Sequence, residues 1–160
     1  MSVLRLRPAR EDDIETLATL NRQLLDDEGH PATVTLGDLM VRHREWLISG
    51  EWSQDILDVD GHVVGYIVHA PNPHPLDPAI PERFIRQFCI DRRFRRNGLG
   101  RDGFELFMEH RVEPGGRVTL DVLESNPTGR AFWESVGCRP FFSRMEVQRD
   151  PNPASTRSDR

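Results

Sequence analysis

The stretch FIRQFCIDRRFRRNGLGR, residues 84–101, leads from an apolar segment into a basic turn that contains two glycines. Residues 84–91 have the aromatic and branched side chains typical of a strand, and a helical spacing of apolar residues follows from Gly98. Gly98 and Gly100 lack side chains, so backbone N–H groups there can close around an anion. The N-terminus of the following helix adds partial positive charge. The stretch therefore predicts a phosphate-binding loop.

The loop has three other interpretations. A solvated basic turn is the simplest, although positive charge at a helix N-terminus is unfavourable unless an anion offsets it. Gly98, Gly100 and Gly103 also match G-x-G-x-x-G, and Asp121 follows about 20 residues on, as in nicotinamide-binding folds. In those folds the first glycine follows the strand almost directly, whereas a basic segment separates Ile90 from Gly98 here. A P-loop is excluded because the sequence has no Lys.

The remaining patterns predict a single α/β domain with a mixed sheet, in the order β-α-α-β-β-β-α-β-α-β. Its one clear parallel crossover lies between residues 84 and 123. Asp60-Gly61 predicts a tight hairpin, and Thr35 with Asp38 resembles a capping box. Strands are expected at 3–7, 55–59, 63–70, 84–91, 118–123 and 141–147, and helices at 11–28, from 35, at 98–110 and at 127–136.

Composition narrows the class of protein. The 160 residues suit one domain, expected at 1–149, with a disordered tail at 150–160. No apolar run is long enough for a membrane span or a secretory signal, so we expect a protein of the cytoplasm. The net charge of −5 argues against nucleic-acid binding. Cys89 and Cys138 form no CxxC pair, and no metal site is predicted.

The sequence resembles the GNAT superfamily of acyltransferases. Ile90 and the run Arg95-Arg96-Asn97-Gly98-Leu99-Gly100 match its central motif, a Val or Ile strand end followed by Arg or Gln-x-x-Gly-x-Gly or Ala. Residues 121–126, DVLESN, and 132–138, FWESVGC, are similar to its strand-Asn-helix-Gly-Phe segment. The resemblance covers about residues 84–142 and implies a GNAT-like fold and acetyl transfer from acetyl-CoA to an amine by direct attack.

The resemblance also implies where acetyl-CoA would bind. The loop residues Arg95, Arg96, Asn97, Gly98, Leu99, Gly100 and Arg101 would hold the pyrophosphate. Backbone groups of Phe88, Cys89 and Ile90 would meet the pantetheine arm, because the family's fourth strand splays from the fifth. Asn126 would hydrogen-bond the same arm from the far side.

One position departs from the family pattern. Many members have a Tyr seven residues after the Asn, to protonate the leaving thiolate, and here that residue is Trp133. A thiol with a pKa of about 8.5 can leave as thiolate without such help, so we expect Trp133 to form a packing wall of the cofactor site. The departure leaves open a second function, a non-catalytic acyl-CoA-binding sensor or assembly module.

Two carboxylates are candidate catalytic bases because of where they lie in the sequence. Several relatives have a Glu five residues before the Asn, and Asp121 stands there, in an apolar segment where burial would raise its pKa. A structural, hydrogen-bonded Asp121 is the alternative, and Glu124 is the next candidate base. Cys89 is disfavoured as an acyl-carrying nucleophile because no His partner can be placed beside it.

The resemblance also implies that the acceptor binds near residues 23–35, where the first two helices and their loop lie. Asp27 and Glu28 lie at the predicted C-terminal end of a helix, where negative charge opposes the helix dipole. This arrangement predicts a cationic amine acceptor, small molecule or peptide, with His30 as another possible base. A solvated acidic turn is the alternative interpretation. A homodimer through the last strands is compatible with this fold.

Overall fold

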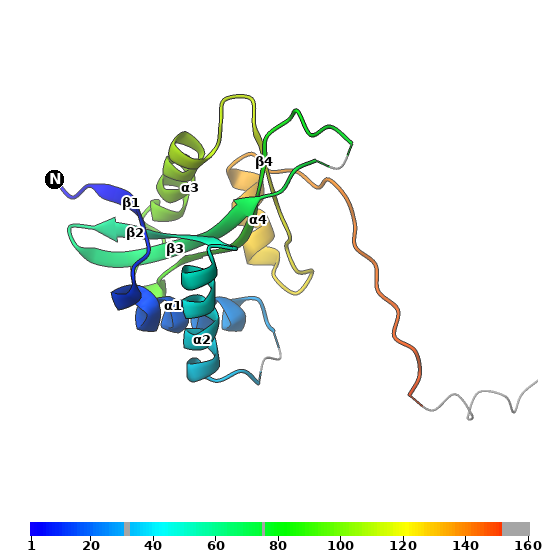
Figure 1. Ribbon diagram of the computed structural model, residues 1–160, viewed down its shortest axis with the longest axis horizontal. Helices are drawn as coiled ribbons and strands as arrows, with labels where there is room; N and C mark the ends of the chain where they lie inside the picture. Colours follow the sequence, from blue (N-terminus) through cyan, green and yellow to red (C-terminus); the bar gives the residue numbers. More distant parts are fainter. Residues whose placement is uncertain (31–32, 75, 152–160) are drawn as a thin grey trace, which may run out of the picture.

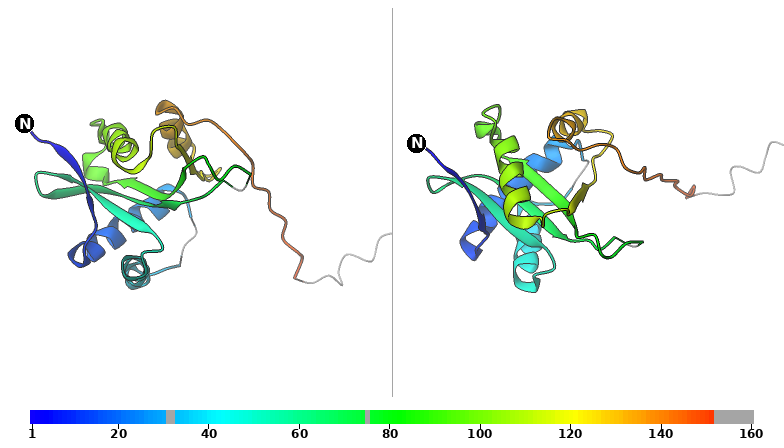
Figure 2. Two further views of the ribbon diagram at one scale, coloured as in Figure 1. Left: turned by 45° about the horizontal axis from the view of Figure 1, so that its top comes forward. Right: turned by 90° about the horizontal axis from the view of Figure 1, so that it is seen from above.

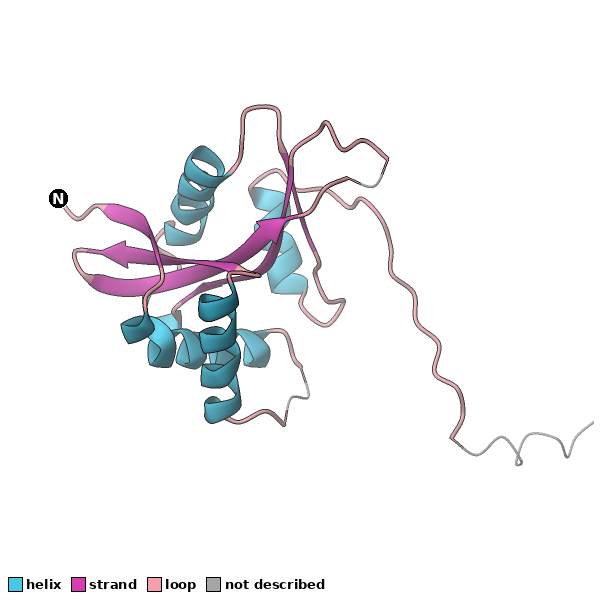
Figure 3. Cartoon of the chain, viewed as in Figure 1, coloured by secondary structure: helices cyan, strands magenta, loops and turns pink. Residues whose placement is uncertain are grey.

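The computed structural model describes residues 1–30, 33–74 and 76–151, which form a five-stranded sheet flanked by helices (Figures 1 and 3). The strand order is β1-β2-β3-β4-β5. The first four strands are antiparallel to their neighbours, and β4 and β5 are parallel. The strands are β1 Leu4–Pro8, β2 Ser53–Val59, β3 His62–Pro71, β4 Glu82–Ile90 and β5 Arg117–Leu120. The predicted mixed sheet with one parallel crossover is confirmed.

Helices cover both faces of the sheet. α1 and α2 lie against one face, and α3 and α4 lie against the other (Figure 2). The α-helices are α1 Ile14–Asp27, α2 Leu36–Ser49, α3 Leu99–Arg111 and α4 Pro127–Ser135, with short 3-10 turns at Glu11–Asp13 and Arg92–Phe94. The capping box between Thr35 and Asp38 is present, and Asp60 and Gly61 take the positive φ angles of a tight hairpin turn, 51° and 84°.

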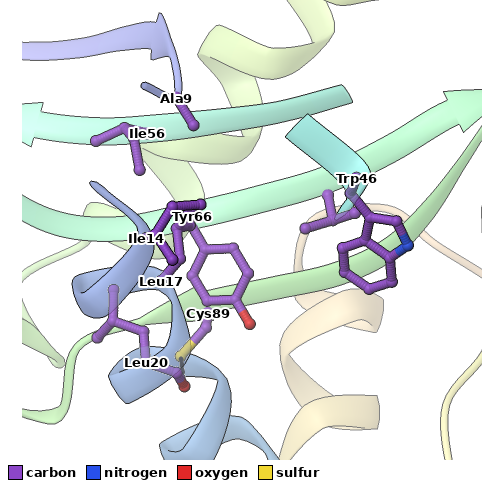
Figure 4. Close-up of a cluster of buried hydrophobic side chains, with 9 residues drawn as sticks. Ala9, Ile14, Leu17, Leu20, Trp46, Ile56, Tyr66 and Cys89 are labelled. Atoms are coloured by element: carbon purple, nitrogen blue, oxygen red, sulfur yellow. Dashed lines mark hydrogen bonds between the residues drawn. The ribbon is translucent and has the colours of Figure 1, made fainter. Parts of the chain in front are cut away.

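The sheet divides the core into two layers because neighbouring strand residues point to opposite faces. Tyr66 and Cys89 face α1, where they pack with Leu17 and Leu20 (Figure 4). Their strand neighbours point to the α3 and α4 face, where the buried members are Leu57, Val64, Ile67, Ile85, Ile90, Phe104 and Phe107. Each face of β4 therefore contributes to a different core, and its backbone lies between them.

The C-terminal end differs from the prediction. Residues 141–147 were expected to form a last strand, but they have no secondary structure and are exposed. β5 ends at Leu120, three residues before its predicted end, because its pairing with β4 stops at Ile85–Leu120. Of the tail expected at 150–160, residues 152–160 lie outside the described part of the chain.

A buried ionic cluster joins the sheet to the end of α3. The carboxylate of Asp55 accepts hydrogen bonds from His69 Nε2 at 2.7 Å and from Arg111 at 2.8 and 2.9 Å. Arg83 donates to His69 Nδ1 at 2.7 Å, so that nitrogen is the acceptor and Nε2 holds the proton. Burial opposes ionisation of Asp55, but the hydrogen bonds from His69 and Arg111 outweigh it and hold the pKa of Asp55 below its usual value.

We expect this cluster to make the fold acid-sensitive. Because the pKa of Asp55 is depressed in the folded state, its stabilisation is complete above the unfolded-state value of about 3.9 and is lost as pH falls through the folded value. Asp55→Asn should cost about 3–5 kcal/mol at neutral pH, because it breaks a buried pair. Denaturant unfolding from about pH 2, below the unfolded-state pKa, up to neutral pH measures both effects.

Glu11→Gln is the matched control, since the Glu11–Arg44 pair is exposed and should be worth about 1 kcal/mol or less. An Asp55→Asn protein as stable as the wild type at neutral pH, with an equal loss in acid, would contradict this account.

Candidate active site

The parallel strands β4 and β5 separate at the centre of the site. They pair from Glu82–Arg117 to Ile85–Leu120, after which β4 continues alone to Ile90. No strand in the described ranges pairs with residues 86–90 on the β5 side. Because the Asp91 N–H donates to the Val64 carbonyl, the backbone groups of Asp91 and Cys89 point to β3, and those of the alternate residues Phe88 and Ile90 point to the open edge. The Ile90 carbonyl there accepts from Arg95 Nε, so the backbone groups of Phe88 and the Ile90 N–H are available to an extended ligand.

The loop after β4 presents backbone N–H groups to the same side. Gly98 is the N-cap of α3, with φ at 76°, and it supplies no side-chain cap, so the N–H groups of the first helical turn have no intrahelical partner. A Cβ built on Gly98 would meet no atom within 4 Å. Arg96 also has a positive φ, 65°, which is uncommon for a residue with a side chain. The loop thus has the open space and the donors that an anion requires.

The five arginines of the loop are not equivalent. Arg96 has no hydrogen-bond or ion-pair partner among the described residues, and it is exposed. The other four are held by protein groups: Arg92 by Gln23, Asp26 and Asp27, Arg93 by Asp91, Arg95 by the Ile90 carbonyl and Asp27, and Arg101 by the Ser135 carbonyl. The structure therefore leaves Arg96 as the guanidinium best able to meet a phosphate.

Helix α4 forms an aromatic wall beside the loop. Trp133 packs against Phe88, Phe104 and Phe132, with ring centroids 5.0–5.5 Å apart. Phe132 lies so close to Gly100 that an added Cβ there would sit 3.0 Å from the ring. Trp133 is therefore packed among aromatic rings, and its predicted contact with a cofactor stays a prediction.

Asn126 lies at the start of α4, where its Oδ1 accepts a hydrogen bond from the Gly129 N–H at 3.0 Å. Its Nδ2 group has no partner within residues 1–30, 33–74 and 76–151. This donor remains available to a ligand that lies between α4 and the free edge of β4.

A pocket of about 270 Å³ lies on the α1 side of the separated strands. The end of α1, the middle of β4 and the residue after β5 form its walls. Ser125 Oγ donates to the Glu28 carbonyl at 2.7 Å, which fixes the end of α1 against the segment after β5. The ionisable residues in its lining are Glu28, His30, Arg86 and Asp121.

The carboxylates in the pocket differ in environment. Burial raises the pKa of Glu28; His30 partly opposes this shift, and the charge of Asp27 adds to it. Asp121 is 49% exposed at its side chain and lies 3.7 Å from Arg144. The expected burial of Asp121 in a strand was therefore wrong, because β5 ends one residue earlier.

Other predicted residues lie outside the pocket lining. Asp27 is paired with Arg95 at 2.6 Å, and Glu124 is an exposed residue paired with Arg130 at 2.9 Å. The Cys89 thiol points into the core, where burial raises its pKa to about 12. Such a thiol is a poor nucleophile, in agreement with the sequence argument.

Sequence reasoning missed a buried polar chain behind the pocket. The Tyr66 hydroxyl donates to Gln87 at 2.9 Å, and Gln87 donates to Asn21 Oδ1 at 3.3 Å. Asn21 then donates to His43 Nε2 at 3.1 Å, and His43 donates to Gln54 at 2.6 Å. Burial lowers the pKa of His43, so its neutral form is favoured. The available signal was polar side chains at positions whose spacing places them in an apolar face.

Comparisons with known proteins agree with this geometry. The model of the family described as "Acetyltransferase (GNAT) family" matches residues 19–138, three quarters of the chain. The protein therefore belongs to the GNAT acetyltransferases and is an N-acetyltransferase. No curated protein sequence matches it. In the described ranges, no helix is long and apolar enough to cross a membrane, and no cluster of side chains could hold a metal ion.

Solved structures with similar folds share little sequence. A possible acetyltransferase from Clostridium difficile 630 is 21% identical, with a TM-score of 0.72 over 92% of this chain and 99% of that one. A predicted acetyltransferase with acetyl-CoA from Clostridium acetobutylicum is 16% identical, with a TM-score of 0.69 over 91% and 96%. An aminoglycoside N-acetyltransferase in complex with CoA is 17% identical, with a TM-score of 0.70 over 94% and 97%.

We expect Arg96 to contribute more to acetyl-CoA binding than its neighbours in the loop, because its guanidinium is not committed to a protein partner. Arg96→Ala should weaken binding by about tenfold or more, the usual size of a lost charge-assisted hydrogen bond. Arg93→Ala is the matched control, since Arg93 is equally part of the exposed loop but is paired with Asp91. Isothermal titration calorimetry of both variants measures the difference. Equal losses would show that Arg96 has no special role.

Gly98→Val should abolish acetyl-CoA binding. A β-branched residue resists a φ of 76°, and its side chain would enter the open space of the loop. The thermal midpoint measured with and without acetyl-CoA tests this, because a ligand of the native state raises it. NADH and ATP at equal concentration should shift the wild-type midpoint far less. A Gly98→Val protein that retains the full acetyl-CoA shift would rule out the loop as the phosphate site.

Proposed function

We propose that this protein transfers the acetyl group of acetyl-CoA to a cationic amine by direct attack, in the pocket between α1, β4 and the end of β5. The observation that carries this proposal is the placement of Glu28, His30 and Asp121 around one pocket, beside the free edge of β4. Two similar structures contain acetyl-CoA or CoA, and one of these proteins is an aminoglycoside N-acetyltransferase. Both facts favour this co-substrate and an amine acceptor.

The residues of the loop and the β4 edge fit acetyl-CoA. The N–H groups at the start of α3 and the Arg96 guanidinium would hold the pyrophosphate. The backbone groups of Phe88 and the Ile90 N–H would bind the pantetheine arm along the free edge of β4, and Asn126 Nδ2 would bind it from the other side. The bound molecule supplies an activated acetyl group as a thioester. Its acetyl end would then lie near the pocket that holds the acceptor.

Charge in the pocket favours a protonated amine. Glu28 and Asp121 are acidic, while the one arginine of the lining, Arg86, stacks on the rings of Trp46 and Trp52 at 5.2 and 4.9 Å. These cation–π contacts hold the Arg86 guanidinium against Trp46 of α2 and against Trp52, which follows α2. The carboxylates therefore set the electrostatic potential of the pocket, and an ammonium group would be attracted to them.

Glu28 is the better candidate for the general base. An ammonium must lose a proton before its nitrogen can attack, and a carboxylate with a raised pKa accepts that proton more readily. Glu28 is half-buried with a raised pKa, whereas Asp121 is exposed. We assign proton acceptance to a carboxylate oxygen of Glu28, directly or through a water, and binding of the acceptor's positive charge to Asp121.

The leaving thiolate needs no side-chain acid in this scheme. A CoA-like thiol has a pKa of about 8.5 and can depart as the anion. Trp133, which replaces the expected Tyr, packs against three phenylalanine rings and provides shape to the site. Membership of an acetyltransferase family favours this enzymatic role over the sensor module considered from the sequence.

Glu28→Gln tests the base directly. We expect kcat to fall by about 10²–10⁴-fold and the acidic limb of the pH–rate profile to disappear. In the wild type that limb should lie above pH 4.3, about the ordinary pKa of Glu, because the rate falls as Glu28 is protonated and its pKa is raised. Asp121→Asn should instead raise the acceptor KM and change kcat less.

Glu124→Gln provides the matched control. Glu124 lies three residues after Asp121 but is exposed, paired with Arg130 and outside the pocket lining, so its substitution should leave the acceptor KM unchanged. If Asp121→Asn removes the acidic limb while Glu28→Gln preserves both kcat and the limb, the roles of the two carboxylates must be exchanged.

A further inference from the structure

Two opposite charges lie where β4 and β5 separate. The last paired residues are Ile85 and Leu120, so Arg86 and Asp121 are the first residues beyond the pairing, one on each side. Ile85 belongs to the core on the α3 and α4 face, so Arg86 points to the other face, where it contacts Trp46 (Figure 4). Arg86 and Asp121 both line the pocket on the α1 side. A guanidinium and a carboxylate therefore lie in the walls of one pocket.

The position of Arg86 is fixed without the use of its hydrogen-bond donors. Its guanidinium carbon lies 5.2 Å from the centre of the Trp46 ring and 4.9 Å from that of the Trp52 ring. Within the described part of the chain, Arg86 has no hydrogen-bond or ion-pair partner, and Asp121 lies 3.7 Å from Arg144 rather than near Arg86. The N–H groups of the Arg86 guanidinium are thus available to a ligand, and their planar arrangement matches the two oxygens of a carboxylate.

The rest of the described lining supplies a second carboxylate and an apolar wall. Glu28 is the second carboxylate, and Leu24, Leu25 and Phe84 contribute apolar surface. The volume of about 270 Å³ is roughly that of nine water molecules in the liquid, at about 30 Å³ each, which suits a ligand of the size of one amino acid. The pocket therefore complements a small ligand with one negative charge, two positive charges and an apolar stem.

We propose that the acceptor is an amino acid with a second amino group on its side chain, whose carboxylate is bound by Arg86 and whose two ammonium groups are bound by Asp121 and Glu28. This inference rests on the proposed acetyl transfer and names the acceptor of the same pocket. Such a molecule has one net positive charge, in agreement with a cationic acceptor. A diamine without a carboxylate would leave the donors of Arg86 unpaired, and an amino acid without a second amine would leave one carboxylate of the pocket unpaired.

The reaction balances with the groups in the pocket. The ammonium at Glu28 gives one proton to its carboxylate, after which the nitrogen bonds to the acetyl carbon, the carbon–sulfur bond breaks and the thiolate leaves. The second proton of the nitrogen goes to that thiolate, directly or through water, so the products are the N-acetylated amino acid and the free thiol. Arg86 takes no part in these steps. It determines specificity through the KM of the acceptor.

The wild-type protein can be tested with acceptors that each lack one group. Lysine, ornithine and diaminobutyrate are compared with their carboxamides, with the diamines that lack the carboxyl group, and with the amino acids that lack the side-chain amine. Thiol release measures kcat/KM for each. The best of the diamino acids should exceed each of its own analogues by about tenfold or more, the usual size of a lost charge-assisted hydrogen bond.

Arg86→Gln and Arg42→Gln form a matched pair of variants. Arg42 lies over the same Trp46 ring, at 5.9 Å, but is outside the pocket lining. Arg86→Gln should raise the KM of the best diamino acid about tenfold or more, with little change in kcat and no change in the KM of the corresponding diamine. Arg42→Gln should change none of these values. Both variants should keep the wild-type KM for acetyl-CoA, which shows that they are folded.

The outcomes separate this inference from the proposed function. A carboxamide, a diamine or any other cationic amine used as well as the best diamino acid overturns this inference and leaves transfer to a cationic amine intact. An amino acid without a side-chain amine that is used equally well, or equal changes in KM for Arg86→Gln and Arg42→Gln, overturns this inference too. Thiol release that no amine stimulates overturns the proposed function and this inference together.

Discussion

The site depends on the separation of two parallel strands. Had β5 continued beside β4, the edge of residues 86–90 would be consumed by sheet hydrogen bonds, and neither a ligand-binding edge nor a pocket at its end would exist. Because pairing stops at Ile85–Leu120, the chain after β5 turns toward the end of α1 and returns as α4 on the opposite face. The thioester and the amine would then approach the same gap from two sides.

A small set of contacts connects the two halves of the site. Arg95 spans them, since its Nε donates to the Ile90 carbonyl at the end of β4 and its terminal nitrogen donates to Asp27 at the end of α1. Glu28 follows Asp27 directly, and Gly98 follows Arg95 by three residues. The position of the proposed base is therefore coupled to the position of the phosphate loop. Such coupling favours a fixed geometry, on which acceleration by proximity depends.

Much of the fold was predictable from local signals. Asp60-Gly61 indicated a hairpin, Thr35 and Asp38 a helix start, and the Arg/Gly segment a strand-to-helix loop, because in each case the residues that specify the structure are neighbours in sequence. The last strand was not predictable in the same way. The pattern of residues 141–147 is typical of a strand, but a strand forms only where a partner edge is available, and that depends on the assembled sheet.

The residues of the candidate site also differ in whether neighbouring sequence is enough to predict their role. The phosphate loop could be recognised because it is continuous, whereas the commitment of Arg95 to Asp27 requires knowing that the ends of α1 and β4 meet. The exposure of Asp121 depends on where β5 pairing stops, which no local pattern encodes. Glu28 was selected from the sequence for its charge at a helix end. Its raised pKa follows from burial that only the tertiary structure supplies.

The most direct test of the central claim is release of free CoA thiol from acetyl-CoA, measured against a panel of cationic, neutral and anionic amines. We expect thiol release that depends on the acceptor and is largest for cationic amines, with the N-acetylated acceptor formed in equal amount by mass spectrometry. Tight binding of acetyl-CoA with release that is the same with and without every amine, or a preference for anionic acceptors, would contradict it.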